Sequence, residues 1–282
     1  MKNAPIGIFD SGIGGLTVAH AIWEKLPREN IVYLGDTARV PYGTRGREVI
    51  SLFARQLARF LLKREVKVMV VACNTISSTC LNEVKALSPV PVIDALSPAA
   101  ETAVKTTRTG VVGVIGTRAT IESGAYEAKI KILDPKIKIL TAACPLFVPL
   151  AEEGLADHPA ADLIARDYLT VFSQTSIDTL ILGCTHYPLL KETIRKVLDR
   201  KVSLIDSARP VAENLADLLE RENLSNDTSQ PVYEFFVTDA PQRVKETAER
   251  FFGHSLPGEI QKISLEKITD NSDQLTKVGT TG

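Results

Sequence analysis

An internal repeat is the feature that most restricts how this chain can fold. Three segments recur in the same order and with similar spacing: a strand with a small polar turn, a strand ending in cysteine and hydrogen-bond donors, and a strand followed by Asp and a Pro-containing helix start. The pairs are "IGIFDSG" at Ile6 with "VGVIGTR" at Val112, "VVACNT" at Val70 with "LILGCTH" at Leu180, and "VIDALSPAA" at Val92 with "LIDSARPVA" at Leu204. Because self-similarity in register marks a repeated structural unit, the sequence predicts two similar domains.

Short apolar runs rich in Val and Ile alternate with helical stretches, a pattern typical of buried parallel strands in α/β proteins. The runs are Ile6–Phe9, Ile31–Leu34, Val68–Ala72, Val111–Ile115, Ile137–Leu140 and Thr179–Gly183. Residues 47–64 show the apolar spacing of an amphipathic helix. We therefore predict two pseudo-symmetric, open parallel-sheet (flavodoxin-like) domains with the active site in the cleft between them. Residues 1–96 and 209–282 are assigned to the first domain and residues 97–208 to the second.

Composition excludes several classes of protein. The net charge of −1 gives no basic field for nucleic acid or a membrane surface. The start "MKNAPIGIFD" has no apolar stretch of a signal peptide, and no apolar run reaches the length of a membrane span. The four cysteines form no CxxC pair. In a chain expected to be cytoplasmic, they are predicted to be buried or catalytic thiols rather than a disulfide framework.

Cys73 and Cys184 occupy equivalent strand ends in the repeat. Ligands of open parallel sheets bind at the carboxyl ends of the strands, so the two thiols are expected to face one pocket. A thiol on either side of a small molecule suits removal of a proton from one face of a stereocentre and its return to the other. Two alternatives remain for these cysteines: a small buried side chain, or a zinc site with ligands from distant segments.

His186, two residues beyond Cys184, is a candidate to assist that thiol, and Glu152 in "PLAEEG" is a candidate partner for the imidazole. The alternatives are a structural histidine and an ordinary acidic helix end. The remaining cysteines and histidines have no polar constellation in the sequence and are expected to be structural or, for the histidines, exposed: Cys80, Cys144, His20, His158 and His254.

Two glycine-containing turns are candidates for binding an anion. "FDSGIGGLTV" has neither the G-x-G-x-x-G dinucleotide fingerprint nor a GK[ST] phosphate loop, so a smaller anion such as a carboxylate fits it better. Asp10 in this turn is a candidate to accept a hydrogen bond from a substrate ammonium, to orient a thiol, or simply to cap the helix. In "GDTARVPYG", Tyr42 and Gly43 follow Pro41 and are expected to present main-chain N–H groups.

Together "FDSGIGGL", "GDTARVPYG", "VACNT", "EEG" and "GCTHYPLL" resemble the signature blocks of the glutamate racemases, in the aspartate/glutamate racemase superfamily. The resemblance covers residues 6–210. It implies interconversion of L- and D-glutamate without cofactor or metal, in the bacterial cytoplasm, by a homodimer whose D-glutamate supplies peptidoglycan. It makes Cys73 the base for the D-isomer and Cys184 the base for the L-isomer, with Asp10 near Cys73 and the substrate amine.

The resemblance also implies that His186 and Glu152 assist Cys184. The implied substrate-binding positions are Asp10, Ser11, Tyr42, Gly43, Asn74, Thr75, Thr117, Thr185 and His186. Two rival functions remain: the same chemistry on aspartate, a hydantoin or a malonate, and a binding module for a dicarboxylate that survives alkylation of its cysteines. The polar tail after Glu266 is expected to be frayed or disordered.

Overall fold

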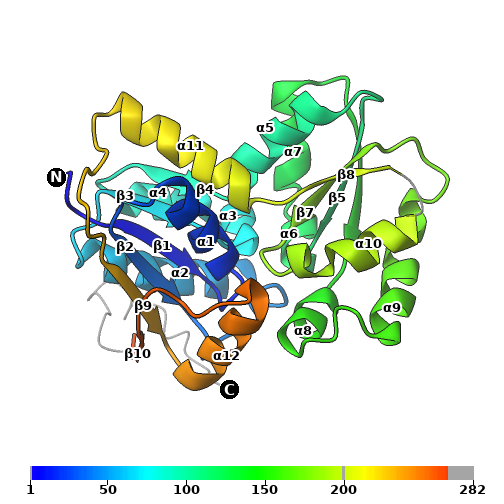
Figure 1. Ribbon diagram of the computed structural model, residues 1–282. Coiled ribbons are helices and arrows are strands. Elements are labelled where there is room, and N and C mark those ends of the chain that lie inside the picture. The colour runs from blue at the N-terminus through cyan, green and yellow to red at the C-terminus, as the bar shows by residue number, and fades with distance from the viewer. Residues whose placement is uncertain (1, 199–200, 266–282) are drawn as a thin grey trace, which may run out of the picture.

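The computed structural model describes residues 2–198 and 201–265, which form two α/β domains around separate, wholly parallel sheets (Figure 1). The predicted tail lies outside the described residues. The six-stranded sheet has the order β10-β9-β2-β1-β3-β4, and the four-stranded sheet has the order β6-β5-β7-β8. The strands are β1 Ile6–Asp10, β2 Ile31–Gly35, β3 Val68–Val71, β4 Val92–Asp94, β5 Val111–Gly116, β6 Lys138–Ala143, β7 Thr179–Gly183, β8 Ser203–Ile205, β9 Tyr233–Val237 and β10 Ile260–Lys262.

The predicted fold class is confirmed, and strand order gives the repeat a structural meaning. When each domain is numbered from its own first strand, both sheets contain the order 2-1-3-4, which is also the start of the flavodoxin-like order. Strands β1, β3 and β4 thus correspond to β5, β7 and β8, as the three sequence pairs require. The first sheet departs from the flavodoxin pattern, because β9 and β10 extend it beyond β2. The domain limits at residues 96 and 209 stay a prediction.

Helices cover both faces of each sheet. One face of the first sheet packs against α1, α11 and α12, and the other face packs against α2 and α4; in the second domain α5 and α7 lie opposite α8, α9 and α10. The helices are α1 Leu16–Lys25, α2 Arg47–Leu62, α3 Asn74–Thr79, α4 Leu81–Leu87, α5 Leu96–Thr106, α6 Arg118–Glu122, α7 Ala125–Leu133, α8 Phe147–Glu152, α9 Pro159–Leu169, α10 Lys191–Leu198, α11 Ala208–Arg221 and α12 Pro241–Phe252, with 3₁₀ turns η1 Thr170–Phe172 and η2 Tyr187–Leu190.

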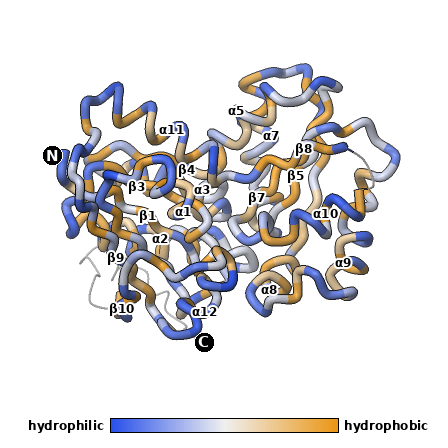
Figure 2. Tube along the Cα trace, in the orientation of Figure 1, coloured by the Kyte–Doolittle hydropathy of each residue, from blue (hydrophilic) through white to orange (hydrophobic). Residues whose placement is uncertain are grey.

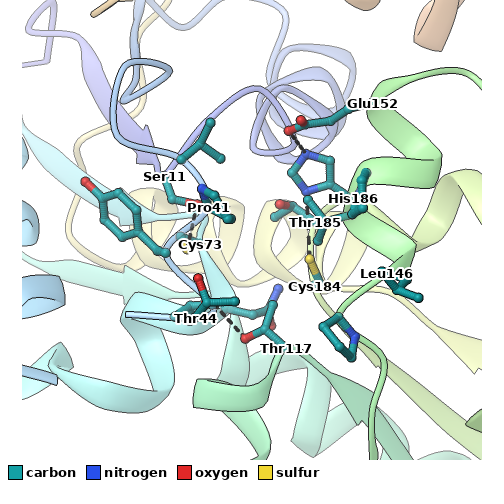
Figure 3. A pocket seen from close by; sticks show the side chains of 18 residues that line it. Ser11, Pro41, Thr44, Cys73, Thr117, Leu146, Glu152, Cys184, Thr185 and His186 are labelled. Carbon is teal, nitrogen blue, oxygen red and sulfur yellow. Dashed lines mark hydrogen bonds and ion pairs between the residues drawn. The ribbon is translucent and has the colours of Figure 1, made fainter. Parts of the chain in front are cut away.

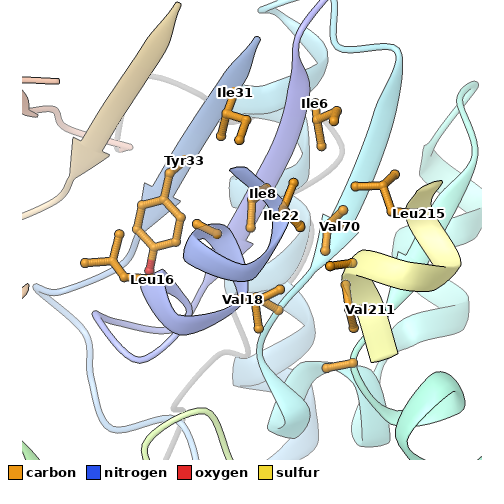
Figure 4. Close-up of a cluster of buried hydrophobic side chains, with 14 of the residues drawn as sticks. Ile6, Ile8, Leu16, Val18, Ile22, Ile31, Tyr33, Val70, Val211 and Leu215 are labelled. Carbon is orange, nitrogen blue, oxygen red and sulfur yellow. The ribbon is translucent and has the colours of Figure 1, made fainter. Parts of the chain in front are cut away.

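Burial explains why the central strands are recognisable from sequence. Hydrophobic segments of the chain run through the middle of each domain (Figure 2), and β1, β2, β3 and β7 are buried along their whole length. Figure 4 shows one such core, where Ile8 and Val70 of the sheet meet Ile22 of α1 and Leu215 of α11. Removing these side chains from water is the main force that holds the layers together.

The sequence interpretation was wrong for one strand. The run at Ile137–Leu140 is not a buried strand: β6 begins at Lys138, runs to Ala143, and is exposed or half-buried throughout. It lies at the edge of the second sheet, where no strand of the described residues pairs with its outer side and burial is incomplete. In the part of the chain that the structure describes, no helix is long and apolar enough to cross a membrane.

A buried ion pair fixes the amino ends of the strands in the first domain. Lys67 Nζ lies 2.5 Å from Glu29 Oε2, and their side chains are only 1% and 3% exposed. The same ammonium donates hydrogen bonds to the main-chain oxygens of Lys2 (2.6 Å) and Leu224 (2.8 Å). Four distant segments therefore meet at one cation.

We expect Lys67→Met to lower the free energy of unfolding by about 3–5 kcal/mol, because it leaves the Glu29 carboxylate buried without its cation. Urea denaturation followed by circular dichroism measures the change. Arg209→Met, which removes an exposed pair with Glu213, is the matched control and should cost less than about 1 kcal/mol. Equal effects of the two substitutions would show that the buried pair has no special role.

Candidate active site

A cavity of about 370 Å³ lies between the two domains, at the carboxyl ends of their strands. Eleven of the twelve site residues expected from the sequence line it; Asp10 does not. The lining residues are Ser11, Val40, Pro41, Tyr42, Gly43, Thr44, Cys73, Asn74, Thr75, Thr117, Pro145, Leu146, Val148, Pro149, Glu152, Cys184, Thr185 and His186. Both halves of the repeat thus contribute to one site.

The two cysteines lie on opposite sides of this cavity (Figure 3). Cys73 follows β3 and directly precedes α3, and Cys184 follows β7 and precedes the 3₁₀ turn η2. Their places are equivalent because β3 and β7 are the third strands of the two matching sheets. Cys73 is 4% exposed and Cys184 is 7% exposed, so a small molecule bound between them would be largely shielded from water.

Cys73 is held within its own domain. Its Sγ donates a hydrogen bond of 3.3 Å to Ser11 Oγ. Burial raises the pKa of the Cys73 thiol to about 12; the negative charge of Asp10 adds to that rise, and the Ser11 hydrogen bond opposes it. This raised pKa favours the neutral thiol at physiological pH, a state suited to donating a proton.

Cys184 belongs to a hydrogen-bonded relay within the second domain. Its Sγ lies 3.8 Å from His186 Nδ1, and His186 Nε2 lies 3.1 Å from Glu152 Oε1 (Figure 3). Burial alone would lower the pKa of His186, but the hydrogen bonds and charges of Cys184 and Glu152 outweigh it and raise that pKa to about 10. The relay therefore places a cationic imidazole beside Cys184 Sγ.

Glu152 supports this relay from the end of α8. Burial acts to raise the pKa of its carboxyl, but the hydrogen bond and charge of His186, together with the charge of Arg243, lower it below its usual value. The carboxylate is therefore ionised at neutral pH and stabilises the His186 cation. The sequence hypothesis that Glu152 pairs with His186 agrees with this geometry.

Asp10 lies behind the cavity wall rather than in it. The side chain is fully buried, and its Oδ2 accepts a hydrogen bond of 2.9 Å from the main-chain N–H of Gly12. Burial raises the pKa of this carboxyl, while His186 and the N–H groups of the loop oppose the rise. These contacts order the loop that precedes α1, and the three roles that the sequence leaves open for Asp10 stay predictions.

Two glycines of that loop lie too close to neighbouring side chains to carry a Cβ. A Cβ on Gly14 would contact Thr185 Oγ1 and lie 2.6 Å from His186 Nδ1, and a Cβ on Gly15 would collide with Asp10. Gly14 therefore makes room for residues of the other domain rather than for a ligand. Only Ser11 from this loop reaches the cavity.

Asn74 is oriented by two hydroxyl groups. Tyr126 Oη and Ser207 Oγ donate to Asn74 Oδ1 at 2.6 and 3.2 Å. Among the described residues, Asn74 Nδ2 is buried and has no hydrogen-bond partner. The amide therefore has an unused donor beside Cys73.

Thr75 and Thr117 join the two domains on the floor of the cavity, with their hydroxyl oxygens 3.0 Å apart. The "GDTARVPYG" loop also reaches across: the main-chain oxygen of Gly43 accepts a hydrogen bond of 3.1 Å from the Ala119 N–H. The Tyr42 hydroxyl, by contrast, donates to the buried Asp36. This loop therefore contributes main chain, more than the phenol, to the cavity.

Sequence reasoning missed the apolar part of the wall. Val40 and Pro41 line the cavity from the first domain, and Pro145, Leu146, Val148 and Pro149 line it from the segment that begins α8. A signal was present, because "CPLFVP" follows β6 in the same place that "GDTARVPYG" follows β2.

The residues expected to be structural lie outside the cavity lining. Cys80 and Cys144 are buried, and burial raises the pKa of Cys80 to about 11. His158 caps α9 by accepting from the Ala160 N–H, and His20 stacks on Phe252. No group of three or more His, Cys, Asp or Glu side chains within residues 2–198 and 201–265 is arranged to hold a metal ion.

Comparison with known proteins places this geometry in a family. The family model described as Asp/Glu/Hydantoin racemase matches residues 16–215. The chain belongs to this family. A curated relative from Syntrophus aciditrophicus, named glutamate racemase, is 50% identical over 262 residues, which are 93% of this chain and 97% of the relative.

Solved structures of this racemase family share the whole architecture. The glutamate racemase of Francisella tularensis, in complex with D-glutamate, matches with a TM-score of 0.89 and 41% identity over 95% of this chain and 100% of that one. The glutamate racemase of Thermus thermophilus, in complex with beta-chloro-D-alanine, matches with a TM-score of 0.84 and 45% identity over 94% and 99% of the two chains. Racemase family membership therefore extends over both domains.

The raised pKa of His186 predicts how the relay stabilises this racemase-family fold as pH changes. A folded pKa of about 10 against the ordinary 6.5 means that the contribution of His186 is full below pH 6.5 and is lost as pH rises toward 10. The lowered pKa of Glu152 gives a contribution that is present above about pH 4.5 and is lost as pH falls below it. The relay should stabilise the fold most between these limits.

We therefore expect the difference in free energy of unfolding between the wild type and His186→Asn to be largest near pH 5.5 and to shrink steadily toward pH 10. Urea denaturation at a series of pH values measures it. A difference that stays constant between pH 5.5 and 9.5 would contradict a cationic His186 in the folded protein.

Proposed function

We propose that this protein is a glutamate racemase that works without a cofactor, with Cys73 and Cys184 as the two acid–base groups. The observation that carries the proposal is the pair of thiols at equivalent strand ends on opposite sides of one interdomain cavity. The proposal that the substrate is glutamate comes from relatives named glutamate racemase, which are 41–50% identical to this chain. The geometry alone supports a small molecule with a stereocentre between the thiols.

In the L-to-D direction, the Cys184 thiolate removes the α-proton and the Cys73 thiol donates its proton to the opposite face. In the D-to-L direction the roles exchange. The raised pKa of Cys73 suits the first direction, in which this thiol donates its proton, and the cationic His186 lies beside the thiol that accepts one. After one turnover the protons must be redistributed before the same direction can run again.

The carbanion needs help, because an α-proton is far less acidic than a thiol. We propose that Asn74 Nδ2, the hydroxyls of Ser11, Thr75, Thr117 and Thr185, and the main chain of Tyr42 and Gly43 hold the substrate carboxylates. Such donors, fixed before the reaction, are each worth about 10²–10³ in rate. The apolar wall excludes water and strengthens these interactions.

We also propose the cellular setting typical of such racemases: a bacterial cytoplasmic enzyme, acting as a homodimer, whose D-glutamate enters peptidoglycan. Asp10 is proposed to act on the substrate amine only indirectly, through the loop that carries Ser11 and through its charge near Cys73.

Proton NMR with L-glutamate in D₂O tests the function, because it reports α-proton exchange and, with a chiral assay, the isomer formed. We expect deuterated D-glutamate, and a kcat/KM for glutamate well above that for aspartate. Equal or higher values for aspartate would move the assignment to another branch of the family. Glutamate binding that is unaffected by alkylation of both cysteines, with no exchange, would favour the binding module.

A further inference from the structure

A second, polar cavity lies behind Glu152, where helix α8 of the second domain meets helix α12 of the first. It has a volume of about 290 Å³ and is lined by Glu152, Glu153, Arg243, Glu246, Thr247 and Arg250. Figure 1 shows α12 in orange beside α8 in green, on the side where the two domains face each other. Glu152 lines both this cavity and the one that holds the thiols.

In this second cavity, Arg250 of the first domain binds the end of helix α8 of the second domain. Its Nη2 donates a hydrogen bond of 2.7 Å to the main-chain oxygen of Glu152. Glu152 is the last residue of α8, where main-chain oxygens have no partner within the helix, and a cationic side chain there satisfies one of them. A Cβ on Gly154 would lie 2.6 Å from Arg250 Nη1, so the guanidinium packs against the turn that ends α8.

The helix that carries Arg250 is held in place by the core of the first domain. Val244 and Ala248 of α12 are buried in the core that also contains β1, α1 and α11. Thr247, one turn before Arg250, is 4% exposed, and its Oγ1 lies 3.5 Å from Arg250 Nη2. A displacement of one domain against the other would therefore be transmitted to the end of α8.

We propose that Arg250 is a positioning residue that acts through Glu152 and His186 on Cys184. The contacts form one series: 2.7 Å from Arg250 to Glu152, 3.1 Å from Glu152 to His186, and 3.8 Å from His186 to Cys184. The series crosses the domain boundary only at Arg250. The series of contacts that ends at Cys184 is therefore complete only when α12 of the first domain meets α8 of the second.

This inference rests on the proposed two-thiol chemistry, and it predicts an effect at Cys184 but not at Cys73. Cys73 is held by Ser11 of its own domain, so the loss of Arg250 should not change its surroundings. If Glu152 loses its anchor, His186 loses a carboxylate that keeps it cationic and in place, and the imidazole is no longer held beside Cys184 Sγ. Cys73 thus serves as an internal control in the same molecule.

The test is the alkylation of both cysteines in Arg250→Gln at pH 7.5 by iodoacetamide, which reacts with the thiolate. Peptide mass spectrometry follows the rates at Cys184 and Cys73. We expect the ratio of the Cys184 rate to the Cys73 rate to fall about 3- to 10-fold, because the cation beside Cys184 is no longer held in place. Arg250→Lys should restore part of the ratio.

Arg243→Gln is the matched control. Arg243 lies on the same helix, and its Nη2 donates to the Glu153 side chain at 2.6 Å, so the substitution removes the same charge and also breaks a contact between the helices. It leaves the main-chain oxygen of Glu152 bound to Arg250. The charge of Arg243 also lowers the pKa of the Glu152 carboxyl, but less than His186 does, so Glu152 stays ionised at pH 7.5. The ratio of rates should therefore stay within about twofold of the wild type, since an exposed pair of this kind contributes little.

Kinetics give a second readout. In Arg250→Gln the primary deuterium isotope effect on kcat/KM should rise more with L-glutamate, whose proton goes to Cys184, than with D-glutamate. Equal changes at both cysteines, an unchanged ratio, or the same fall in Arg243→Gln would overturn the role of Arg250 while leaving racemisation by the wild type intact. A wild type that does not racemise glutamate would overturn the proposed function instead, and the alkylation ratio would still decide the role of Arg250.

Discussion

Replacing either Cys73 or Cys184 by alanine is expected to abolish glutamate racemisation, because each turnover needs one thiolate to take the α-proton and one thiol to give it back. General acid–base groups contribute about 10²–10⁴ each, so each single variant should lose at least that factor in kcat. A chiral assay of product measures the loss. Exchange of the α-proton without inversion can survive in either variant, since one thiol remains.

Cys80→Ala and Cys144→Ala are the matched controls, because both residues are buried thiols outside the cavity lining. They should racemise at rates close to the wild type, with circular dichroism confirming that all four variants fold. The wild type must show equal kcat/KM in the two directions, because the equilibrium constant between enantiomers is one. An inactive Cys144→Ala beside an active Cys73→Ala would refute the pairing of thiols.

Gly14→Ala is expected to lower kcat/KM by about 10²-fold, although Gly14 does not line the cavity. The added methyl would collide with Thr185 and the His186 ring, and so displace the imidazole that supports Cys184. A misplacement of about 1 Å at a reacting group costs a factor of this size. Steady-state kinetics with both enantiomers measures the loss.

Gly46→Ala is the control for this substitution, because a Cβ there would meet no atom within 4 Å. It should leave the kinetic constants unchanged. A Gly14→Ala protein with wild-type kcat/KM would mean that His186 can shift without consequence, and the relay described above would lose its role in catalysis.

The sequence determined the domain architecture and the two thiols for a simple reason. Strands that are buried on both faces need an unbroken apolar run, so the central strands leave a local signal that one chain displays twice. Because equivalent strands end at equivalent places, the repeat also paired Cys73 with Cys184 before any contact was known. This reasoning does not hold for the edge strand β6, because a strand that is only partly buried does not need an unbroken apolar run.

The tertiary structure decided what depends on contacts between distant segments. It placed Asp10 behind the wall, assigned Gly14 to make room for His186, and brought Arg250 to Glu152, 98 residues away in the chain. The sequence of α12 contains no recognisable motif, and its arginines look like those of any solvent-exposed helix face. Arg250 points toward the second domain because the apolar face of α12 packs on the first domain. Contacts between two domains depend on the whole fold, so the periodicity of a single segment cannot predict them.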